Sequence, residues 1–468
     1  MHAEYDDLMR LLTPHGQEHL LRWWPELDDA QRACLAEQVR AVDWSTLARA
    51  RDEALAAVGP IDLPIHPAPV RRLAASFEEW EQEQAAAETG QDLLREGSVA
   101  VLLVAGGQGT RLGHPGPKGA YPIGPVTQRT LFQIHAEKVL ALGRRYETSL
   151  PLCIMTSPDN DAQTRRFFEE HRYFGLEPEQ VHFFVQGTLP AVDAASGKAL
   201  LASRHELALS PNGHGGVVEA LTQSRLLARL EKQGVKHLFY FQVDNPLVKI
   251  ADPAFLGLHV QAGAELSLKV LPKLSPEERL GVVVEVGEKL RVIEYSDLPA
   301  ELASKRNERG ELELWAGSIA IHVFDTAFLK RLAESSALPF HRAHKVVPHL
   351  DHAGCLSQPE KPHALKFERF VFDALPLARK ALVIETSRRE EFEPLKNARG
   401  ENSPGTVRQA MSNLYADWLE AAGVTVPRHA DGSSRFPIEI SPLFALDAEE
   451  LRGKPLNLEA VEGPLVLE

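Results

Sequence analysis

From Ser98 onward, short apolar runs alternate with segments whose apolar residues recur every three to four positions. The runs VAVLLVA, PLCIMTS, VHFFVQG and HLFYFQVDN have the length of strands, and stretches such as TLFQIHAEKVLALGRRY have helical periodicity. Strands that alternate with helices predict a parallel sheet with helices on both faces. Later apolar runs, such as AELSLKVL and GVVVEVG, add strands of which some should be antiparallel. The sequence therefore predicts an α/β fold with a mixed central sheet.

The chain has 468 residues, which exceeds the usual size of one hydrophobic core. Residues 1–94 read mainly as helices, and the alternating pattern occupies residues 95–400. The tail after residue 400 has short β-like pieces among many prolines and glycines. We therefore expect an N-terminal helical region, a central α/β domain, and a small β-rich domain over residues 401–468.

Composition argues against two classes of partner, although a local basic cleft in an acidic protein stays an alternative. Hydrophobic residues make up 44% of the chain and charged residues 25%, as in a globular protein, and the formal net charge is −14. An acidic chain is a poor ligand for a nucleic-acid polymer or an anionic membrane. The three cysteines are far apart and odd in number, which fits a reducing compartment. With no signal peptide or bilayer-length apolar run in this sequence, the expected location is the cytoplasm.

The first predicted strand leads into a glycine-rich basic loop, AGGQGTRLGHPGPKG. Glycine lets a ligand approach the backbone closely, and Arg111 and Lys118 add positive charge, so the loop is a candidate phosphate site. A P-loop requires G-x-x-x-x-G-K-[ST], but Lys118 precedes a glycine. A dinucleotide fingerprint requires a third glycine where Leu112 stands. The loop is therefore an extended ligand loop at the carboxyl edge of a sheet, with a glycine-rich surface turn as the alternative.

Other polar residues follow apolar strands. Asp244 ends the run HLFYFQVDN, and an ionised carboxylate there needs a partner such as Mg²⁺, although a strand-end Asp is also a common turn former. Gln186 and Glu294 follow two further runs. Considered alone, Phe370 and Phe372 read as core residues and Lys396 as an exposed lysine.

Several stretches taken in chain order resemble the UDP-sugar pyrophosphorylase family, and within it the UDP-N-acetylhexosamine pyrophosphorylases. The stretches are GGQGTRLG with the following PKG, VDNPLVKIADPAFLG, KFERFVFD and EFEPLKNA, and the resemblance covers residues 95–400. It implies a central glycosyltransferase-A-like nucleotide-binding domain with an N-terminal helical region and a small C-terminal β-rich domain. It also implies a nucleotidyltransferase in which a sugar 1-phosphate attacks the α-phosphate of UTP in line and releases pyrophosphate.

The same resemblance assigns roles to individual residues. It implies that Arg111, Lys118 and Lys396 are catalytic cations and that Asp244 binds Mg²⁺. The positions implied to bind the nucleotide are Ala105, Gly106, Gly107, Gln186, Gly213 and His214. Those implied to bind the sugar are Glu294, Trp315, Phe370 and Phe372.

The sequence departs from the N-acetylhexosamine enzymes in one segment. Where they carry an Asn-rich stretch resembling NAGNIANH, this chain has WAGSIAIH, with Trp315 in place of the first Asn. His214 stands in GHGG, which is similar to UDP-glucose pyrophosphorylases. We expect N-acetylglucosamine 1-phosphate as the sugar substrate, with glucose 1-phosphate or a broad sugar range as the alternative. A non-catalytic nucleotide-sugar sensor on the same scaffold is a further alternative.

Overall fold

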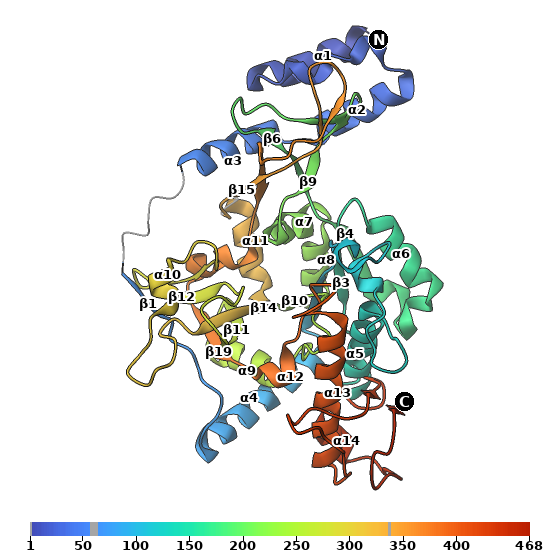
Figure 1. Cartoon of the computed structure of the whole chain (residues 1–468), viewed down its shortest axis with the longest axis vertical. Coiled ribbons are helices and arrows are strands. Elements are labelled where there is room, and N and C mark those ends of the chain that lie inside the picture. The colour runs from blue at the N-terminus through green and yellow to red at the C-terminus, as the bar shows by residue number, and fades with distance from the viewer. Residues whose placement is uncertain (1, 57–63, 336–337) are drawn as a thin grey trace. The chain divides into compact units, whose positions relative to one another are not determined.

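The computed structural model describes residues 2–56, 64–335 and 338–468. The chain forms two compact units, each assembled from three segments. Unit 1 contains residues 1–62, 186–220 and 335–373, and unit 2 contains residues 63–185, 221–334 and 374–468. Figure 1 shows both units with the elements labelled.

Unit 2 is built on a mixed sheet. Its strands are β1 (Ile65–Pro67), β2 (Val99–Val104), β3 (Leu152–Thr156), β4 (Val181–Val185), β10 (His237–Gln242), β11 (Leu266–Pro272), β12 (Val282–Val286), β13 (Lys289–Ile293), β14 (Ala316–Asp325) and β19 (Ala381–Glu385). The main path runs β1-β12-β14-β10-β2-β3-β4, and β11 pairs with β14 and β19. The neighbours β10, β2, β3 and β4 are parallel, so their carboxyl ends meet at one edge. This arrangement confirms the predicted α/β fold.

The antiparallel strand β14 lies at the centre of the mixed sheet, between β10 and β11. Its pairing with β11 is irregular, because Leu268 pairs with His322 and Val270 with Ser318. Three residues of β14 therefore oppose one residue of β11, and among them Ala320 has a φ of 57°. A bulge of this kind bends a strand locally, here in the segment that departs from the Asn-rich pattern.

The helices of unit 2 bury an apolar core against the sheet. They are α4 (Phe77–Arg95), α5 (Leu131–Arg145), α6 (Asp161–Glu170), α8 (Leu226–Lys232), α9 (Pro253–Gln261), α10 (Ala300–Ser304), α11 (Thr326–Ser335), α12 (Arg388–Glu391), α13 (Pro404–Ala421) and α14 (Ala448–Arg452), with α11 reaching unit 1 at its last residue. Helices α4 and α9 touch through their backbones, because a Cβ at Gly257 would lie 1.7 Å from the Ala86 carbonyl oxygen. Only glycine permits this approach.

The C-terminal part of unit 2 combines a helix with a small sheet. Strands β20 (Ile438–Ile440) and β21 (Leu465–Leu467) form a parallel pair, as the β-like tail predicts. The largest element of this part is α13, whose buried face includes Val407, Met411 and Leu419. The structure groups the C-terminal part with unit 2, so the division into ranges 1–94, 95–400 and 401–468 stays a prediction.

Unit 1 joins N-terminal helices to short strands from later in the chain. Its elements are α1 (His2–Leu12), α2 (Asp29–Ala41), α3 (Trp44–Ala56), β5 (Thr188–Pro190), β6 (Val192–Asp193), β7 (Leu201–Ser203), β8 (Glu206–Leu207), β9 (Leu209–Pro211), β15 (His341–Lys345), β16 (His349–Leu350), β17 (Leu356–Ser357) and β18 (Ala364–Glu368), and α7 (Val217–Gln223) continues into unit 2. One core contains Leu12 and Trp24 from the first segment, Leu189 from the second and Phe367 from the third. Each segment therefore needs the other two to bury its apolar side chains.

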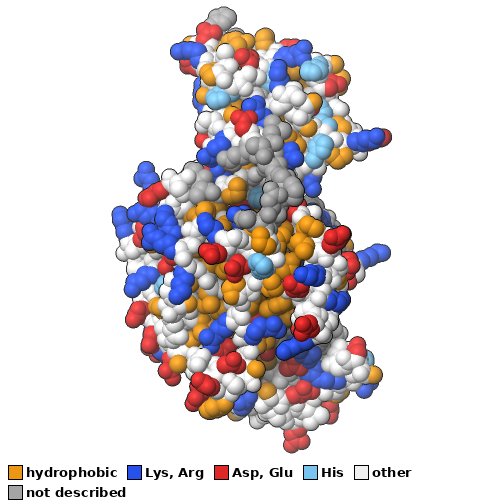
Figure 2. Space-filling model, turned by 90° about the vertical axis from the view of Figure 1, so that its left-hand side faces the viewer, with side chains coloured by type: hydrophobic (Ala, Val, Ile, Leu, Met, Phe, Trp, Pro, Cys, Tyr) orange, Lys and Arg blue, Asp and Glu red, His pale blue; other side chains and the backbone are white. Residues whose placement is uncertain are grey.

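The formal net charge is −14, but the face shown in Figure 2 carries acidic and basic side chains side by side rather than one acidic patch. Among the helices that the structure describes, none has both the length and the apolar character needed to cross a bilayer.

Candidate functional site

The glycine-rich loop and Asp244 leave neighbouring strands at the same edge of the sheet of unit 2. Strand β2 ends at Val104 and β10 at Gln242, and these two residues are partners in a parallel pairing. The loop continues from β2, and Asp244 follows β10 by two residues. In open α/β sheets this carboxyl edge is where ligands bind.

The loop holds its shape through backbone and side-chain hydrogen bonds. Gly109 N donates to Gly116 O at 2.8 Å, and Lys118 N donates to Gly107 O at 3.0 Å. Asn160, which lies between β3 and α6, donates through Nδ2 to Ala105 O at 2.9 Å and to Gly107 O at 3.3 Å. The start of the loop is therefore fixed from two sides before any ligand arrives.

Two glycines of the loop have different structural roles. A Cβ at Gly119 would lie 2.2 Å from the Phe132 ring, so this glycine is required for packing. Gly107 is exposed, and a Cβ there would meet nothing closer than Lys118 Cδ at 4.0 Å. Packing does not require glycine at position 107, which leaves its bare backbone open to a ligand.

Lys118, Asp244 and Lys396 form one electrostatic group. Lys118 Nζ lies 3.0 Å from Asp244 Oδ2, and both side chains are largely shielded from solvent. Burial alone would raise the pKa of Asp244, but the charges of Lys118 and Lys396 more than offset it and hold the pKa below its usual value. The two cations therefore favour the ionised form of the Asp244 carboxylate.

The backbone of Asp244 is tied to the segment that carries Lys396. Leu395 N donates to Asp244 O at 2.8 Å, and Asn245 Nδ2 donates to Glu391 O at 2.7 Å. Asn245 Oδ1 accepts bonds from Leu247 N and Glu393 N, both at 3.3 Å. Asn245 is buried, so its side chain links the two functional segments inside the protein.

Two side chains of helix α5 bind backbone carbonyls of the segment that contains Asp244. His135 Nε2 donates to Val243 O at 3.0 Å, and Lys138 Nζ donates to Pro246 O at 2.6 Å and Val248 O at 2.8 Å. Burial lowers the pKa of His135 to about 3, so its imidazole is neutral. Sequence patterns did not single out His135, Lys138, Asn160 or Asn245. The one available indication for Asn245 was its place in the motif VDNP.

Arg111 differs from the two lysines. It lies in the short 3₁₀ turn Thr110–Leu112, and its side chain is exposed. Among the residues that the structure describes, no carboxylate forms an ion pair with Arg111. A guanidinium on the same loop as Lys118 is therefore available to an anionic ligand.

Glu294 and Trp315 lie near the same region of the sheet. Ile293, which precedes Glu294, pairs with Val282, and Val282 also pairs with Gly317 at the start of β14. The Arg72 guanidinium stacks on the Trp315 ring at 4.1 Å. Arg72 Nε in turn donates to Glu385 Oε2 at 2.6 Å. One face of the Trp315 ring is thus covered by a packing partner of the protein itself.

The remaining predicted residues belong to unit 1, where they contact one another. Gln186 Nε2 donates to Gly213 O at 2.5 Å, and His214 Nδ1 accepts a bond from Val371 N at 3.2 Å. Burial lowers the pKa of His214 to about 4, so the ring is neutral and able to accept this bond. Phe370 stacks on His214 with ring centroids 5.3 Å apart, and Phe372 lies 5.1 Å from Phe370.

The structure thus places Ala105, Gly106, Gly107, Arg111, Lys118, Asp244, Glu294, Trp315 and Lys396 in unit 2, and Gln186, Gly213, His214, Phe370 and Phe372 in unit 1. Their roles toward ligands stay predictions. The group in unit 2 consists of two half-buried lysines, the exposed Arg111 and the ionised carboxylate of Asp244. Such a set is suited to binding a polyphosphate together with a hard cation.

Comparisons with known proteins agree with this chemistry. The sequence profile of the family described as UTP–glucose-1-phosphate uridylyltransferase matches residues 65–428. The chain is 37% identical to the UDP-N-acetylhexosamine pyrophosphorylase-like protein 1 of Xenopus tropicalis, over 97% of this chain and 94% of that protein. It is 41% identical to the UDP-N-acetylglucosamine pyrophosphorylase of Saccharomyces cerevisiae, over 72% and 73%. The solved uridine diphosphate N-acetylglucosamine pyrophosphorylase of Trypanosoma brucei superposes with a TM-score of 0.84 at 27% identity, covering 98% of each chain.

Proposed function

The chain belongs to the UTP–glucose-1-phosphate uridylyltransferase family of nucleotidyltransferases, and we propose that it joins UTP to N-acetylglucosamine 1-phosphate and releases pyrophosphate. The observation that carries the proposal is the group of Lys118, Asp244 and Lys396 at the carboxyl edge, beside a loop whose backbone is open at Gly107. The relatives named above support the choice of sugar.

The reaction needs cations more than it needs a base. A sugar 1-phosphate is already largely ionised at neutral pH, so its oxygen attacks the α-phosphorus without giving up a proton to the protein. The barrier arises because two anions must meet and negative charge moves onto the leaving pyrophosphate. Fixed positive groups therefore supply most of the catalysis, and one such group is worth about 3–4 kcal/mol.

Each cation of unit 2 has a distinct place in this scheme. Lys118 is held on the loop and binds the triphosphate, while Lys396 holds the sugar phosphate on the segment tied to Asp244. Arg111 is exposed and carries no competing ion pair among the described residues, so its fork can bind phosphate oxygens as charge shifts. The hydrogen bonds around Ala105 and Gly107 fix the loop, which lowers the cost of ordering it around the nucleotide.

The residues present fit a Mg²⁺ ion. Asp244 is ionised and lies at a strand end, and one carboxylate with substrate phosphates and water is a common set of Mg²⁺ ligands. When bound, the ion would neutralise phosphate charge near the α-phosphorus. Asp244 would hold it, while Lys118 and Lys396 keep the carboxylate in its charged form.

Two other functions remain in competition. The first is uridylyl transfer to glucose 1-phosphate. Trp315 favours this alternative, because it lies in a segment that is rich in Asn in N-acetylhexosamine enzymes. A non-catalytic sensor would be expected to have lost a catalytic charge, yet Arg111, Lys118, Asp244 and Lys396 are all present. The same charges that support the enzyme therefore argue against the sensor.

The test is pyrophosphate release from UTP with a panel of sugar 1-phosphates, with Mg²⁺ and with chelator. We expect the highest kcat/KM for N-acetylglucosamine 1-phosphate and no turnover in chelator. Arg111→Ala should lower kcat by at least 100-fold, whereas Arg309→Ala, a change at an exposed arginine on another turn, should leave it unchanged. A higher kcat/KM for glucose 1-phosphate would overturn the choice of sugar, and no turnover with any sugar would favour the sensor.

A further inference from the structure

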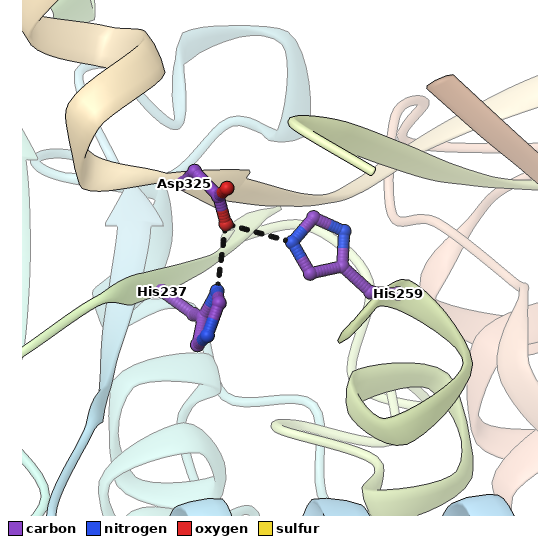
Figure 3. Close-up of side chains that lie close together, drawn as sticks. All are labelled: His237, His259 and Asp325. Atoms are coloured by element: carbon purple, nitrogen blue, oxygen red, sulfur yellow. Dashed lines mark hydrogen bonds and ion pairs between the residues drawn. The ribbon is translucent and has the colours of Figure 1, made fainter. Parts of the chain in front are cut away.

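A cluster of two histidines and an aspartate lies at the opposite end of β10 from Asp244. His237 begins β10, Asp325 ends β14, and His259 lies in α9. Figure 3 shows both imidazole rings turned toward one oxygen of the Asp325 carboxylate. His237 Nδ1 lies 2.8 Å from Asp325 Oδ1, and His259 Nε2 lies 3.0 Å from the same atom.

The three side chains offer donor atoms at the spacing of metal ligands. One nitrogen of each imidazole and one carboxylate oxygen all lie within 4.8 Å of one another. Ligands at about 2.0–2.1 Å around a tetrahedral ion are roughly 3.3 Å apart, close to the two nitrogen–oxygen distances. Two imidazoles and one carboxylate form a donor set that binds Zn²⁺ and similar divalent ions more tightly than Mg²⁺.

His259 is oriented as a metal-binding histidine would be. Its side chain is fully buried, so the ring is held in place by the core around it. Its other nitrogen, Nδ1, lies 2.7 Å from Ser267 Oγ on β11. A hydrogen bond at the second nitrogen fixes the orientation of a ligating histidine ring. Ser267 is itself buried, so this support belongs to the core.

The charge of the cluster leaves room for a cation. Within the described part of the chain, the ion pairs of Asp325 are with His237 and His259, and no lysine or arginine joins them. In the form that binds a metal, both imidazoles are neutral, so the three ligands together carry the single negative charge of Asp325. The Asp325 side chain is 32% exposed, which gives an ion and a completing water access from solvent.

We propose that His237, His259 and Asp325 bind one divalent ion of the Zn²⁺ class, a site separate from the nucleotide-binding edge. His237 and Gln242 lie at the two ends of β10, five residues or roughly 17 Å apart at about 3.3 Å per residue, and Asp244 follows two residues after Gln242. The ion joins β10, β14 and α9 at the amino-terminal end of the parallel strands, so its role is to stabilise unit 2.

Metal binding is measured on the full chain after removal of metal with a chelator. Isothermal titration with Zn²⁺ should give one high-affinity equivalent, and Co²⁺ should give the visible absorption of a low-symmetry site. Zn²⁺ should also raise the melting temperature, and excess Mg²⁺ should not displace it. These readouts do not depend on turnover, so the result is independent of the proposed function.

Variants distinguish the site from binding to other histidines. Asp325→Asn keeps an oxygen for both imidazoles to hydrogen-bond but removes the charge, and it should weaken Zn²⁺ binding by more than roughly 100-fold. His259→Gln should do the same, whereas His171→Gln, a change at an exposed histidine, should leave binding intact. Absence of a stoichiometric high-affinity Zn²⁺ site, or equal binding by Asp325→Asn, would leave only a hydrogen-bonded triad and overturn the proposal.

Discussion

Replacing Asn245 with alanine should damage both stability and turnover. The Asn245 side chain makes three hydrogen bonds, at 2.7, 3.3 and 3.3 Å, and it is buried. Removing it leaves the Glu391 carbonyl and two backbone N–H groups without partners. An unsatisfied buried group costs about 1–3 kcal/mol, and two of the three bonds are long, so the expected loss in the free energy of unfolding is about 2–4 kcal/mol.

Asn307 offers a matched control. Its side chain also accepts two backbone bonds, from Arg309 N at 2.9 Å and Glu311 N at 3.0 Å, and donates one, to Glu311 Oε2 at 3.2 Å. It is exposed, so water can replace all three bonds. Asn307→Ala should therefore cost less than about 1 kcal/mol. Urea unfolding at equilibrium gives both values.

The effect on activity tests the link between Asp244 and Lys396. A displacement of about 1 Å at a reacting group can lower the rate by about 100-fold, so kcat of Asn245→Ala should fall by about 10–100-fold under conditions where the variant is folded. Pyrophosphate release from UTP and N-acetylglucosamine 1-phosphate measures it. A stability loss no larger than that of Asn307→Ala would refute the burial argument. Normal kcat in a destabilised variant would refute the link.

Three further predictions concern other parts of the chain. Gly257→Ala should destabilise the protein by about 1–3 kcal/mol because its Cβ would overlap the backbone of α4, whereas Gly405→Ala in α13, where the nearest atom is 3.9 Å away, should be neutral or stabilising in urea unfolding. Trp315→Asn should shift the kcat/KM ratio toward N-acetylglucosamine 1-phosphate over glucose 1-phosphate by about 1–3 kcal/mol, and an unchanged ratio would remove Trp315 from the choice of sugar. The pKa of Asp43 is lowered to about 2, because hydrogen bonds from Ser45 and Thr46 outweigh its partial burial. A lowered carboxyl pKa stabilises the fold above pH 3.8 and loses this effect as the pH falls toward 2. The unfolding free energies of the wild type and Asp43→Ala should therefore differ by about 1 kcal/mol near neutral pH, since Asp43 is exposed, and should converge as the pH falls from about 4 to about 2. A difference that persists at low pH would show that the charge is not responsible.

The sequence predicted the features that depend on short stretches of chain. The apolar runs before the glycine-rich loop and before Asp244 became β2 and β10, and their parallel pairing brought both segments to one edge. Periodicity was sufficient to place each segment at the end of a strand in a parallel sheet, whereas the pairing of β2 with β10 comes from the structure. The resemblance in GGQGTRLG and VDNP identified the family that the comparisons confirm.

What the sequence did not predict depends on contacts between distant residues. Asn160 lies about fifty positions beyond the loop backbone that it holds, and no local pattern marks such a bond. The cluster of His237, His259 and Asp325 could not be predicted, because its residues are far apart in sequence and meet only through the pairing of β10 with β14 and the packing of α9. For the C-terminal part, the many prolines and glycines led to the prediction of a β-rich domain, whereas its largest element is the helix α13.

The three-segment construction of unit 1 has a consequence for synthesis of the protein. A nascent chain that has produced only the N-terminal helices holds Leu12 and Trp24 without the strands that cover them, because Leu189 and Phe367 are made much later. The ribosome must finish residues 335–373 before that core can close. During this interval, the N-terminal helices are an exposed apolar surface of the kind that chaperones bind and that promotes aggregation, and slower elongation lengthens the exposure. Production of this protein should therefore be more sensitive to translation rate and chaperone supply than its native stability would indicate.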